Sequence, residues 1–170
     1  VNTRALEALF KCSETRAHEI EDEVQVSILE IYNENIRDLL RDPKADVSKL
    51  KYDIMRDQHV GMYVKDLTSE QIHTASHAKK IIDTGNKNRV TSSTGLNDQS
   101  SRSHMVVTLT VRTHQHKGGD HYVGKLSLVD LAGSERVKKT GIEGTVLKEA
   151  KYINLSLHFL EQVERHVQCL

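Results

Sequence analysis

"KLSLVDLAGSERVKK", Lys125 to Lys139, is the stretch that says most about the fold of this chain. Apolar and polar side chains alternate through its first half, as in a β-strand with one buried face. Asp130 and Gly133 stand where this alternation ends. A carboxylate there can bind a magnesium ion through a water molecule, and a glycine amide can approach a phosphate closely because no Cβ blocks it. A plain strand followed by a turn is the competing interpretation, since short motifs often match by chance.

A second motif, "NDQSSRSH" from Asn97 to His104, precedes another apolar run. Its adjacent serines, Ser100 and Ser101, can offer hydroxyl groups to magnesium and to a phosphate oxygen, and Arg102 follows them. By itself, a serine-rich loop beside a strand is more often a simple turn. The two motifs together favour a site for a phosphate and its magnesium ion.

The two motifs resemble the switch I and switch II loops of the kinesin motor family. The switch I pattern N-x-x-S-S-R-S-H is complete at residues 97–104, and L-V-D-L-A-G-S-E is complete at 128–135, with its switch II part at 130–135. Nearly the whole chain resembles the family. The resemblance implies an α/β fold of the P-loop NTPase type, with a mixed central sheet flanked by helices. Further blocks occur in kinesin order, namely "LEIYNENIRDLL" at 29–40, "YVKDLT" at 63–68, "NKNR" at 86–89 and "EAKYINLSL" at 149–157.

The resemblance also implies a role for each matching residue around the nucleotide. Ser101 would be the magnesium ligand, and Ser100 would face the γ-phosphate and the attacking water. Asn97 would help to hold this loop. Asp130 would bind a magnesium-linked water, and the amide of Gly133 would sense the γ-phosphate. The implied cofactors are therefore ATP and magnesium.

Two further groups of residues take roles from the resemblance. Arg102 and Glu135 would form the salt bridge that closes the two switches and would act with the two serines in catalysis. A relay helix at about 146–168 would lie on the microtubule. Leu155 departs from the family, because many kinesins have a basic residue there. The residues expected to contact acidic tubulin are Arg136, Lys138, Lys139, Lys151 and Asn154.

The implied function is a microtubule motor ATPase that couples ATP hydrolysis to movement, mainly by positioning groups and neutralising charge. The phosphate-binding loop G-x-x-x-x-G-K-[ST] is expected upstream of Val1. Its nearest match, at 119–125, has Leu126 in the hydroxyl position and precedes an apolar strand. We therefore expect an incomplete motor domain, with N-terminal and C-terminal parts absent and little activity on its own. The alternative is a degenerate, non-catalytic microtubule-binding module that has lost this loop.

Composition limits the partners and the location. Twenty-four basic residues balance twenty-four acidic ones, which excludes a globally basic nucleic-acid binder. No apolar stretch is long enough to span a membrane. The resemblance implies a location in the cytoplasm, at the microtubule cytoskeleton. A dimer through a coiled coil outside these residues is expected from the family. His114, His116 and His121 form a possible metal cluster, but histidines on a turn without acidic partners are more often solvated.

Apolar periodicity predicts the secondary structure along the chain. Gly85 is placed like a C-terminal helix cap, and a polar loop is expected from Asn86 to Ser101. The expected elements are the end of a helix at 3–10, a strand at 23–32, a short helix at 33–40, strands near 52–55 and 62–67, a helix from 69 to 85, a strand at 104–111, a hairpin turn at 114–120, its return strand at 122–131, and the long helix at about 146–168.

The kinesin subfamily stays open at this level. "VNTRALEALF" at residues 1–10 resembles the C-terminal motors of the kinesin-14 group, which walk toward the microtubule minus end. "INLSLHFLEQV" at 153–163 resembles the kinesin-9 group. The two segments point to different groups, so direction of movement and cargo are not predicted.

Overall fold

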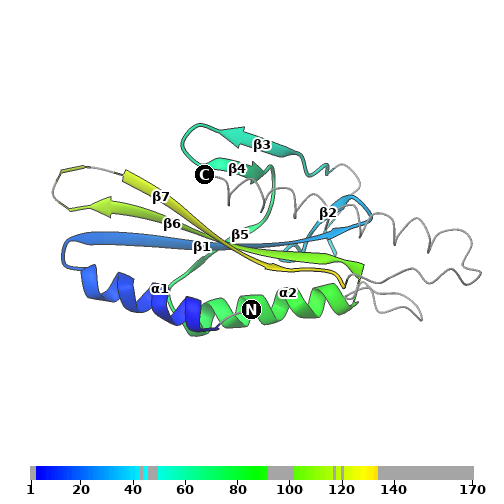
Figure 1. The fold of residues 1–170 in the computed structure, drawn as a ribbon, viewed down its shortest axis with the longest axis horizontal. Coiled ribbons are helices and arrows are strands. Elements are labelled where there is room, and N and C mark those ends of the chain that lie inside the picture. The colour runs from blue at the N-terminus through cyan, green and yellow to red at the C-terminus, as the bar shows by residue number, and fades with distance from the viewer. Residues whose placement is uncertain are drawn as a thin grey trace, which may run out of the picture.

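A computed structural model describes residues 3–42, 44–45, 50–91, 102–116, 118–119 and 121–133 of this chain. Both helices of this part lie on one side of the main sheet, and the β3–β4 hairpin lies on the other (Figure 1). Neither helix is long and apolar enough to cross a membrane. The elements are α1 Thr3–Arg16, β1 Ile20–Tyr32, β2 Asn35–Asp38, β3 Ile54–Asp57, β4 Gly61–Val64, β5 Ser69–Ile72, α2 Ala75–Thr91, β6 His104–Gln115 and β7 His121–Asp130.

The main sheet has five strands in the described residues, in the order β2-β1-β6-β7, with β5 also paired to β1. Every pairing in it is antiparallel. The long β1–β6 ladder runs from Ile20 opposite Gln115 to Ile31 opposite His104. The expectation of an α/β fold with a central sheet and flanking helices is confirmed.

Alternation along β1 explains why the helices cover one face of the sheet. Val24, Val26 and Ile28 are buried, whereas Gln25 and Ser27 between them are only partly buried. Burying each such aliphatic side chain stabilises the fold by roughly 1.5–3 kcal/mol. The core that these residues form with the helices contains Leu6, Leu39, Ile72, Ala78, Ile81, Ile82, Met105, Val107 and Leu109.

The short helix expected at 33–40 is wrong, because a tight hairpin forms there instead. Asn33 and Glu34 have positive φ angles of 49° and 63°, the conformation that a two-residue hairpin turn requires. The chain therefore reverses into β2, with Asn35 opposite Tyr32. Asp38 ends the strand by accepting hydrogen bonds from the backbone N–H groups of the turn that follows. Apolar residues at helical spacing also fit a short strand and a turn, so periodicity alone does not distinguish the two structures here.

The start of the helix expected at 69 is also wrong. Residues Ser69–Ile72 form β5, which pairs with β1 from Val24 to Ser27. Helix α2 begins only at Ala75, after Thr74, whose Oγ1 accepts a hydrogen bond from the N–H of His77 at 3.1 Å. A capping threonine is a typical helix start. The sequence did not reveal this strand, because its apolar residue Ile72 lies at helical spacing from the apolar residues of α2.

Gly85 is not a C-terminal cap, because α2 continues past it to Thr91. Gly85 is buried, and a Cβ added to it would lie 2.9 Å from Cδ1 of Ile28. The glycine therefore allows α2 to approach β1 closely, which is a different use of a missing side chain. The loop expected from Asn86 is accordingly helical as far as Thr91, and residues 92–101 lie outside the described part.

The other expected elements agree with the structure apart from their ends. Helix α1 continues to Arg16, six residues beyond Phe10, and β1 starts three residues earlier than expected, at Ile20. The hairpin of β6 and β7 is present, although His114 and Gln115 belong to β6. The β3–β4 pair confirms the two short strands at slightly shifted positions. The long helix expected at about 146–168 lies outside the described residues.

Candidate functional site

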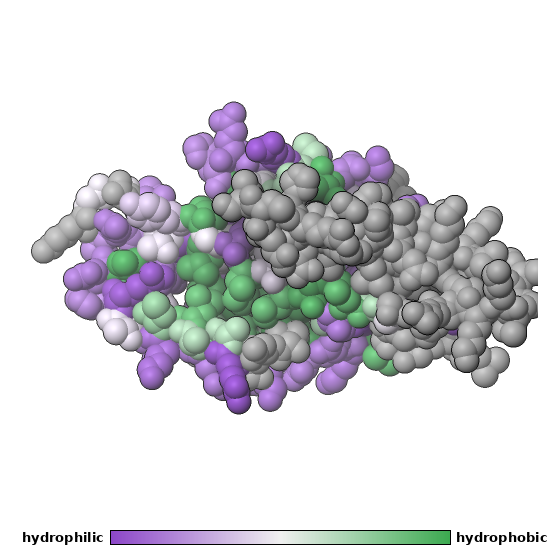
Figure 2. All heavy atoms as spheres, viewed as in Figure 1, coloured by the Kyte–Doolittle hydropathy of each residue, from purple (hydrophilic) through white to green (hydrophobic). Residues whose placement is uncertain are grey.

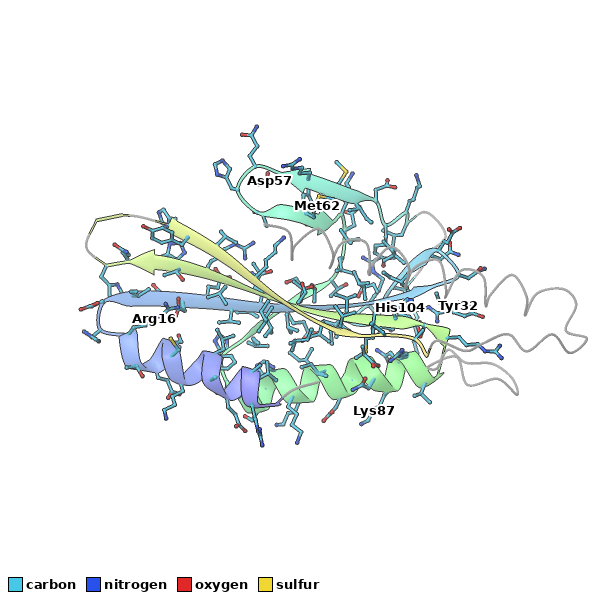
Figure 3. The ribbon with its side chains drawn as sticks, viewed as in Figure 1. Arg16, Tyr32, Asp57, Met62, Lys87 and His104 are labelled. Carbon is cyan, nitrogen blue, oxygen red and sulfur yellow. The ribbon has the colours of Figure 1, made fainter. Side chains whose placement is uncertain are left out.

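The ends of the two motifs meet at one end of the sheet. Strand β6 begins at His104, the last residue of the serine-rich motif, and β7 ends at Asp130. The two strands are antiparallel and neighbouring, with Met105 opposite Asp130. Figure 3 labels His104 at this end, which is also where α2 ends. The segment that enters β6 and the segment that follows β7 are far apart in the sequence, but they lie side by side at this end of the sheet.

One arginine from α2 joins both segments. The guanidinium of Arg89 donates from Nη1 to Oδ2 of Asp130 at 2.7 Å. It also donates from Nε to Oγ of Ser103 at 3.1 Å and from Nη2 to the Ser103 carbonyl oxygen at 2.7 Å. The rigid fork of the guanidinium allows these contacts at the same time. Arg89 is thus a common partner of the residue before β6 and of the last residue of β7.

A buried carboxylate from β1 balances the charge of Arg89. The side chain of Glu30 is 0% exposed, and its Oε1 lies 3.6 Å from Nε of Arg89. No hydrogen-bond donor reaches this Oε1 within the described part of the chain. The other oxygen, Oε2, accepts from Nη1 of Arg37 at 3.4 Å. A carboxylate so deeply buried is costly without a cation beside it, so Glu30 holds Arg89 in place.

Arg89 and Asp130 differ in their exposure. The side chain of Arg89 is 6% exposed, whereas that of Asp130 is 61% exposed. The cation is therefore fixed inside the protein, and the carboxylate stands at the surface. Asp130 is consequently the member of the pair that a ligand can reach.

His104 ties the chain after β7 to the start of β6. Its Nδ1 accepts a hydrogen bond from the N–H of Ala132 at 3.0 Å, and the residue is buried. Burial lowers the pKa of His104, and the neighbouring Arg89 cation lowers that pKa further. A neutral imidazole is needed here, because Nδ1 can accept a hydrogen bond only when it carries no proton. The contact fixes the backbone two residues beyond Asp130.

Three of the candidate site residues lie in the described part. Arg102 is partly buried just before β6, and Asp130 and Gly133 lie at and after the end of β7. The implied pair of Arg102 with Glu135 involves a residue outside this part and stays a prediction. The other candidates outside the described residues are Asn97, Ser100, Ser101, Arg136, Lys138, Lys139, Lys151 and Asn154.

Sequence reasoning missed Arg89 and Glu30 as parts of the site. The block "NKNR" at 86–89 contributed only to the resemblance to the family. A usable signal was present, because Glu30 interrupts the apolar run "SILEIY" of a buried strand. A charge at such a position requires a buried partner of opposite sign. That requirement pointed to a basic residue elsewhere in the chain.

The histidines near the β6–β7 hairpin do not form a metal cluster in the described residues. His114 and His121 lie opposite each other on the two strands, with their Nδ1 atoms 2.5 Å apart. His116 instead faces the carbonyl oxygen of Ala17. No group of three or more His, Cys, Asp or Glu residues that could hold a metal ion is found in that part of the chain.

A groove of about 460 Å³ lies on the other face of the sheet, under the β3–β4 hairpin. Lys125 of β7 lines it and donates from Nζ to the carbonyl oxygen of Met62 at 2.8 Å. Burial lowers the pKa of Lys125, and Arg112 adds to this effect. Glu30, Ser103 and Asp130, which contact Arg89, do not line the groove. The groove is therefore separate from the end of the sheet where the two motifs meet.

Comparisons with known proteins agree with one another. A family model described as the kinesin motor domain matches residues 1–168. The kinesin-like protein KIN-14D of Oryza sativa subsp. japonica is 46% identical over 164 residues, and KIN-14P of Arabidopsis thaliana is 43% identical over 163 residues. The solved C-terminal motor and motor homology domain of Kar3Vik1, fused to a synthetic heterodimeric coiled coil, is similar with a TM-score of 0.79 at 32% identity.

These matches cover almost all of this chain but only part of each relative. The aligned residues are 96% of the chain and 16% of the length of either plant protein. The solved structure covers 94% of the chain, which corresponds to 40% of the solved chain. The chain thus corresponds to a segment of longer proteins.

Proposed function

This chain belongs to the kinesin motor domain family, and on that premise we propose that it is the switch-bearing part of a microtubule-stimulated ATPase motor. Motor domains of this family bind ATP and microtubules. The observation that supports the proposal most is the meeting of the two motif ends at Arg89, with Asp130 on one side and Ser103 on the other. Two loops that release a terminal phosphate together need a shared attachment to the rest of the fold.

Magnesium is the cofactor that fits the residues present. Hard oxygen donors are the ligands that magnesium prefers, and the accessible carboxylate of Asp130 is one of them. In the proposal, Ser101 supplies a direct hydroxyl ligand, and Asp130 holds a metal-bound water. The ion, when bound, neutralises the charge of the β- and γ-phosphates.

The remaining residues of the proposal position the terminal phosphate and the attacking water. Ser100 would face the γ-phosphate and the attacking water, and the amide of Gly133 would sense the γ-phosphate. Asn97 would help to hold the serine-rich loop. Arg102 and Glu135 close the two loops over the site. Little covalent chemistry is left to the protein, because phosphoryl transfer is accelerated mainly by alignment and charge stabilisation.

Loss of the γ-phosphate releases both loops, and the change passes to the segment that contacts the microtubule. In the proposal, the relay helix at about 146–168 carries this change. Its basic residues and those of the preceding loop face the acidic tubulin surface. The basic residues are Arg136, Lys138, Lys139 and Lys151, and the uncharged Asn154 is expected to contact tubulin beside them.

The open edge of β7 supports the proposal that further motor segments complete this sheet. Among the described residues, β7 pairs only with β6. Val123, Leu126 and Val129 of β7 are exposed, and Figure 2 shows hydrophobic residues gathered in the middle of the visible face. We expect the 170 residues by themselves to aggregate and to bind ATP weakly, which size-exclusion chromatography and nucleotide titration would test. A monodisperse monomer with micromolar ATP affinity would contradict this expectation.

The assembly and location of the whole protein follow from the family. We propose a dimer through a coiled coil outside these residues, at microtubules in the cytoplasm. Of the two subfamily resemblances, the kinesin-14 alternative is favoured by the KIN-14 names of both plant relatives.

The test of the proposed function is ATP turnover by the complete protein with and without microtubules. Phosphate release that rises with microtubule concentration is the expected result. Microtubule binding without any ATP turnover would instead favour the degenerate, non-catalytic module. An intact G-x-x-x-x-G-K-[ST] in the coding sequence upstream of Val1 would exclude that module.

A further inference from the structure

We propose that His114 and His121 form a two-histidine site for a divalent transition metal ion, with zinc as the expected occupant. The inference goes beyond the proposed function and does not depend on it. The site lies on the β6–β7 hairpin, at the end of the sheet where Figure 3 labels Arg16. Strand β7 has 10 residues from His121 to Asp130, so the two positions are about 30 Å apart along an extended chain. The site is therefore remote from the end of the sheet where the two motifs meet.

The first argument is that two ring nitrogens converge. His114 of β6 and His121 of β7 are direct partners in the antiparallel ladder, so their side chains lie on the same face of the sheet. Their Nδ1 atoms are 2.5 Å apart, and the rings meet edge to face with centroids 4.5 Å apart. One Nδ1 must carry a proton and donate it to the other. Two imidazole nitrogens directed at one shared proton are also directed at one shared metal ion.

The second argument is that the pair can adopt the geometry of a zinc site by a small movement. Zinc–nitrogen bonds of about 2.0–2.1 Å at a tetrahedral angle hold two nitrogens about 3.3 Å apart. The two Nδ1 atoms must therefore separate by less than about 1 Å. His121 is exposed and His114 is partly buried, so the rings have room to rotate and the ion has access from solvent. The ion takes the place of the shared proton, which moves to Nε2 of its ring or to solvent.

The third argument is an acidic neighbour that the sequence did not reveal. Glu21 of β1 lies opposite His114, so Glu21, His114 and His121 form one row across three neighbouring strands. The next row pairs Glu23 with Arg112, whose charges are of opposite sign. Glu21 therefore leaves one negative charge in excess beside the two imidazoles, which favours a cation.

The number and type of ligands indicate which ion binds. Imidazole nitrogen suits zinc, copper and nickel, whereas magnesium prefers oxygen ligands. The described residues contain no group of three side chains that could hold a metal ion, so water completes the coordination in this proposal. The magnesium that accompanies a nucleotide is accordingly a poor competitor for the pair.

The experiment titrates the complete protein with zinc, in saturating magnesium, and measures zinc binding by calorimetry. We expect His121→Asn to weaken the zinc binding of this site by about 10-fold or more, because the second bond of a chelate forms at a high effective concentration. His116→Asn is the matched control, since His116 is near the same turn but faces the carbonyl oxygen of Ala17. We expect the control to bind zinc as the wild type does.

Thermal unfolding gives a second readout on the same proteins. An ion that binds only the folded state raises the unfolding midpoint in proportion to its affinity. Zinc should raise the midpoint of the wild type and of His116→Asn equally, and that of His121→Asn less. His114→Gln is the second variant in case His121→Asn does not fold, with the same expected loss. We expect Glu21→Gln to weaken zinc binding only about threefold, as for one exposed charge.

Each outcome decides for or against the pair. Zinc affinity in a folded His121→Asn or His114→Gln variant equal to that of the wild type would overturn the inference. An equal loss in His116→Asn would also overturn it, because the ion would then bind to the turn and not to the pair. ATP turnover is measured separately, so zinc binding at the pair in a protein without turnover would contradict only the proposed function. Normal turnover without a zinc site would contradict only this inference.

Discussion

The two ends of the main sheet each carry an arginine–aspartate pair, and the two pairs are built in opposite ways. At one end, Arg16 of α1 binds Asp22 of β1 at 2.8 Å; at the other, Arg89 of α2 binds Asp130 of β7 at 2.7 Å. Figure 3 labels Arg16 at the first end and His104 at the second. The exposed fractions of arginine and aspartate are 37% and 1% at the first end, and 6% and 61% at the second.

The difference teaches how one kind of ion pair serves two purposes. The carboxylate of Asp22 is buried and fully engaged by Arg16 and by Oγ1 of Thr113 at 2.7 Å, so it joins α1, β1 and β6. The carboxylate of Asp130 is held from inside by a buried cation and remains accessible. The first pair is therefore a structural link, and the second leaves a carboxylate at the surface, where the proposed function requires it.

The largest expected effect is on ATP turnover, and it tests the role of Asp130 in this comparison. We expect Asp130→Asn to reduce microtubule-stimulated phosphate release of the complete motor on the order of 100-fold, the size typical for loss of one preorganised charged group. Its unfolding midpoint should change little, because the side chain is exposed. Turnover within twofold of the wild type would place Asp130 outside the chemistry.

The second expected effect is on the stability of the fold, at the end of the sheet that carries Asp22. We expect Asp22→Asn to lower the free energy of unfolding by about 2–3 kcal/mol, because it breaks a buried pair and leaves its partners poorly matched. Denaturant titration measures this change, and turnover per folded molecule should stay normal. Lys51→Gln is the control, since the exposed Lys51–Asp53 pair at 3.1 Å should contribute less than about 1 kcal/mol. Equal losses in the two variants would contradict the structural role of Asp22.

A third effect concerns the placement of the helix that carries Arg89. We expect Gly85→Ala to destabilise the fold by about 1 kcal/mol, because the clash with Ile28 exceeds the gain in helix propensity. Adding Ile28→Val removes Cδ1, so the double variant should lose less than the sum of the single losses. Additive losses, measured by the same denaturant titration, would show that Gly85 and Ile28 do not constrain each other.

The smallest effect is the pH dependence of stability that Asp22 contributes. Burial raises the pKa of Asp22, but hydrogen bonds from Thr113 and Arg16 outweigh it and hold that pKa below its usual value of 3.8. The stabilisation is therefore complete above pH 3.8 and is lost as the pH falls through the lowered pKa of the folded state. The stability difference between wild type and Asp22→Asn should narrow below pH 3.8. A difference that stays constant through this range would contradict the assignment.

The sequence was sufficient for the parts of the fold that alternate cleanly. The strand over residues 23–32 and the β6–β7 hairpin were predicted because their apolar residues alternate and glycines mark the turn. The helix expected at 33–40 failed because two residues with positive φ angles reverse the chain there. The cap expected at Gly85 failed because a buried glycine in a helix looks, in sequence, like one at its end.

The sequence could suggest members of the candidate site only where they belong to one contiguous motif. Asp130 and Arg102 entered the prediction because they belong to contiguous patterns, and their roles stay predictions. Arg89 and Glu30 were missed because their partnership spans separate elements, and only the packing of α2 on β1 brings them together. Charged residues on apolar faces are the signal for such partnerships, but the sequence does not say which two meet.

The most direct test of the contrast between the two ends is one magnesium titration of nucleotide retention by the complete motor, with Asp22→Asn and Asp130→Asn side by side. We expect Asp130→Asn to need at least about 10-fold more magnesium than the wild type, and Asp22→Asn to need the same amount as the wild type. Equal magnesium requirements in the two variants would contradict the assignment of Asp130 to the ligand and Asp22 to the fold.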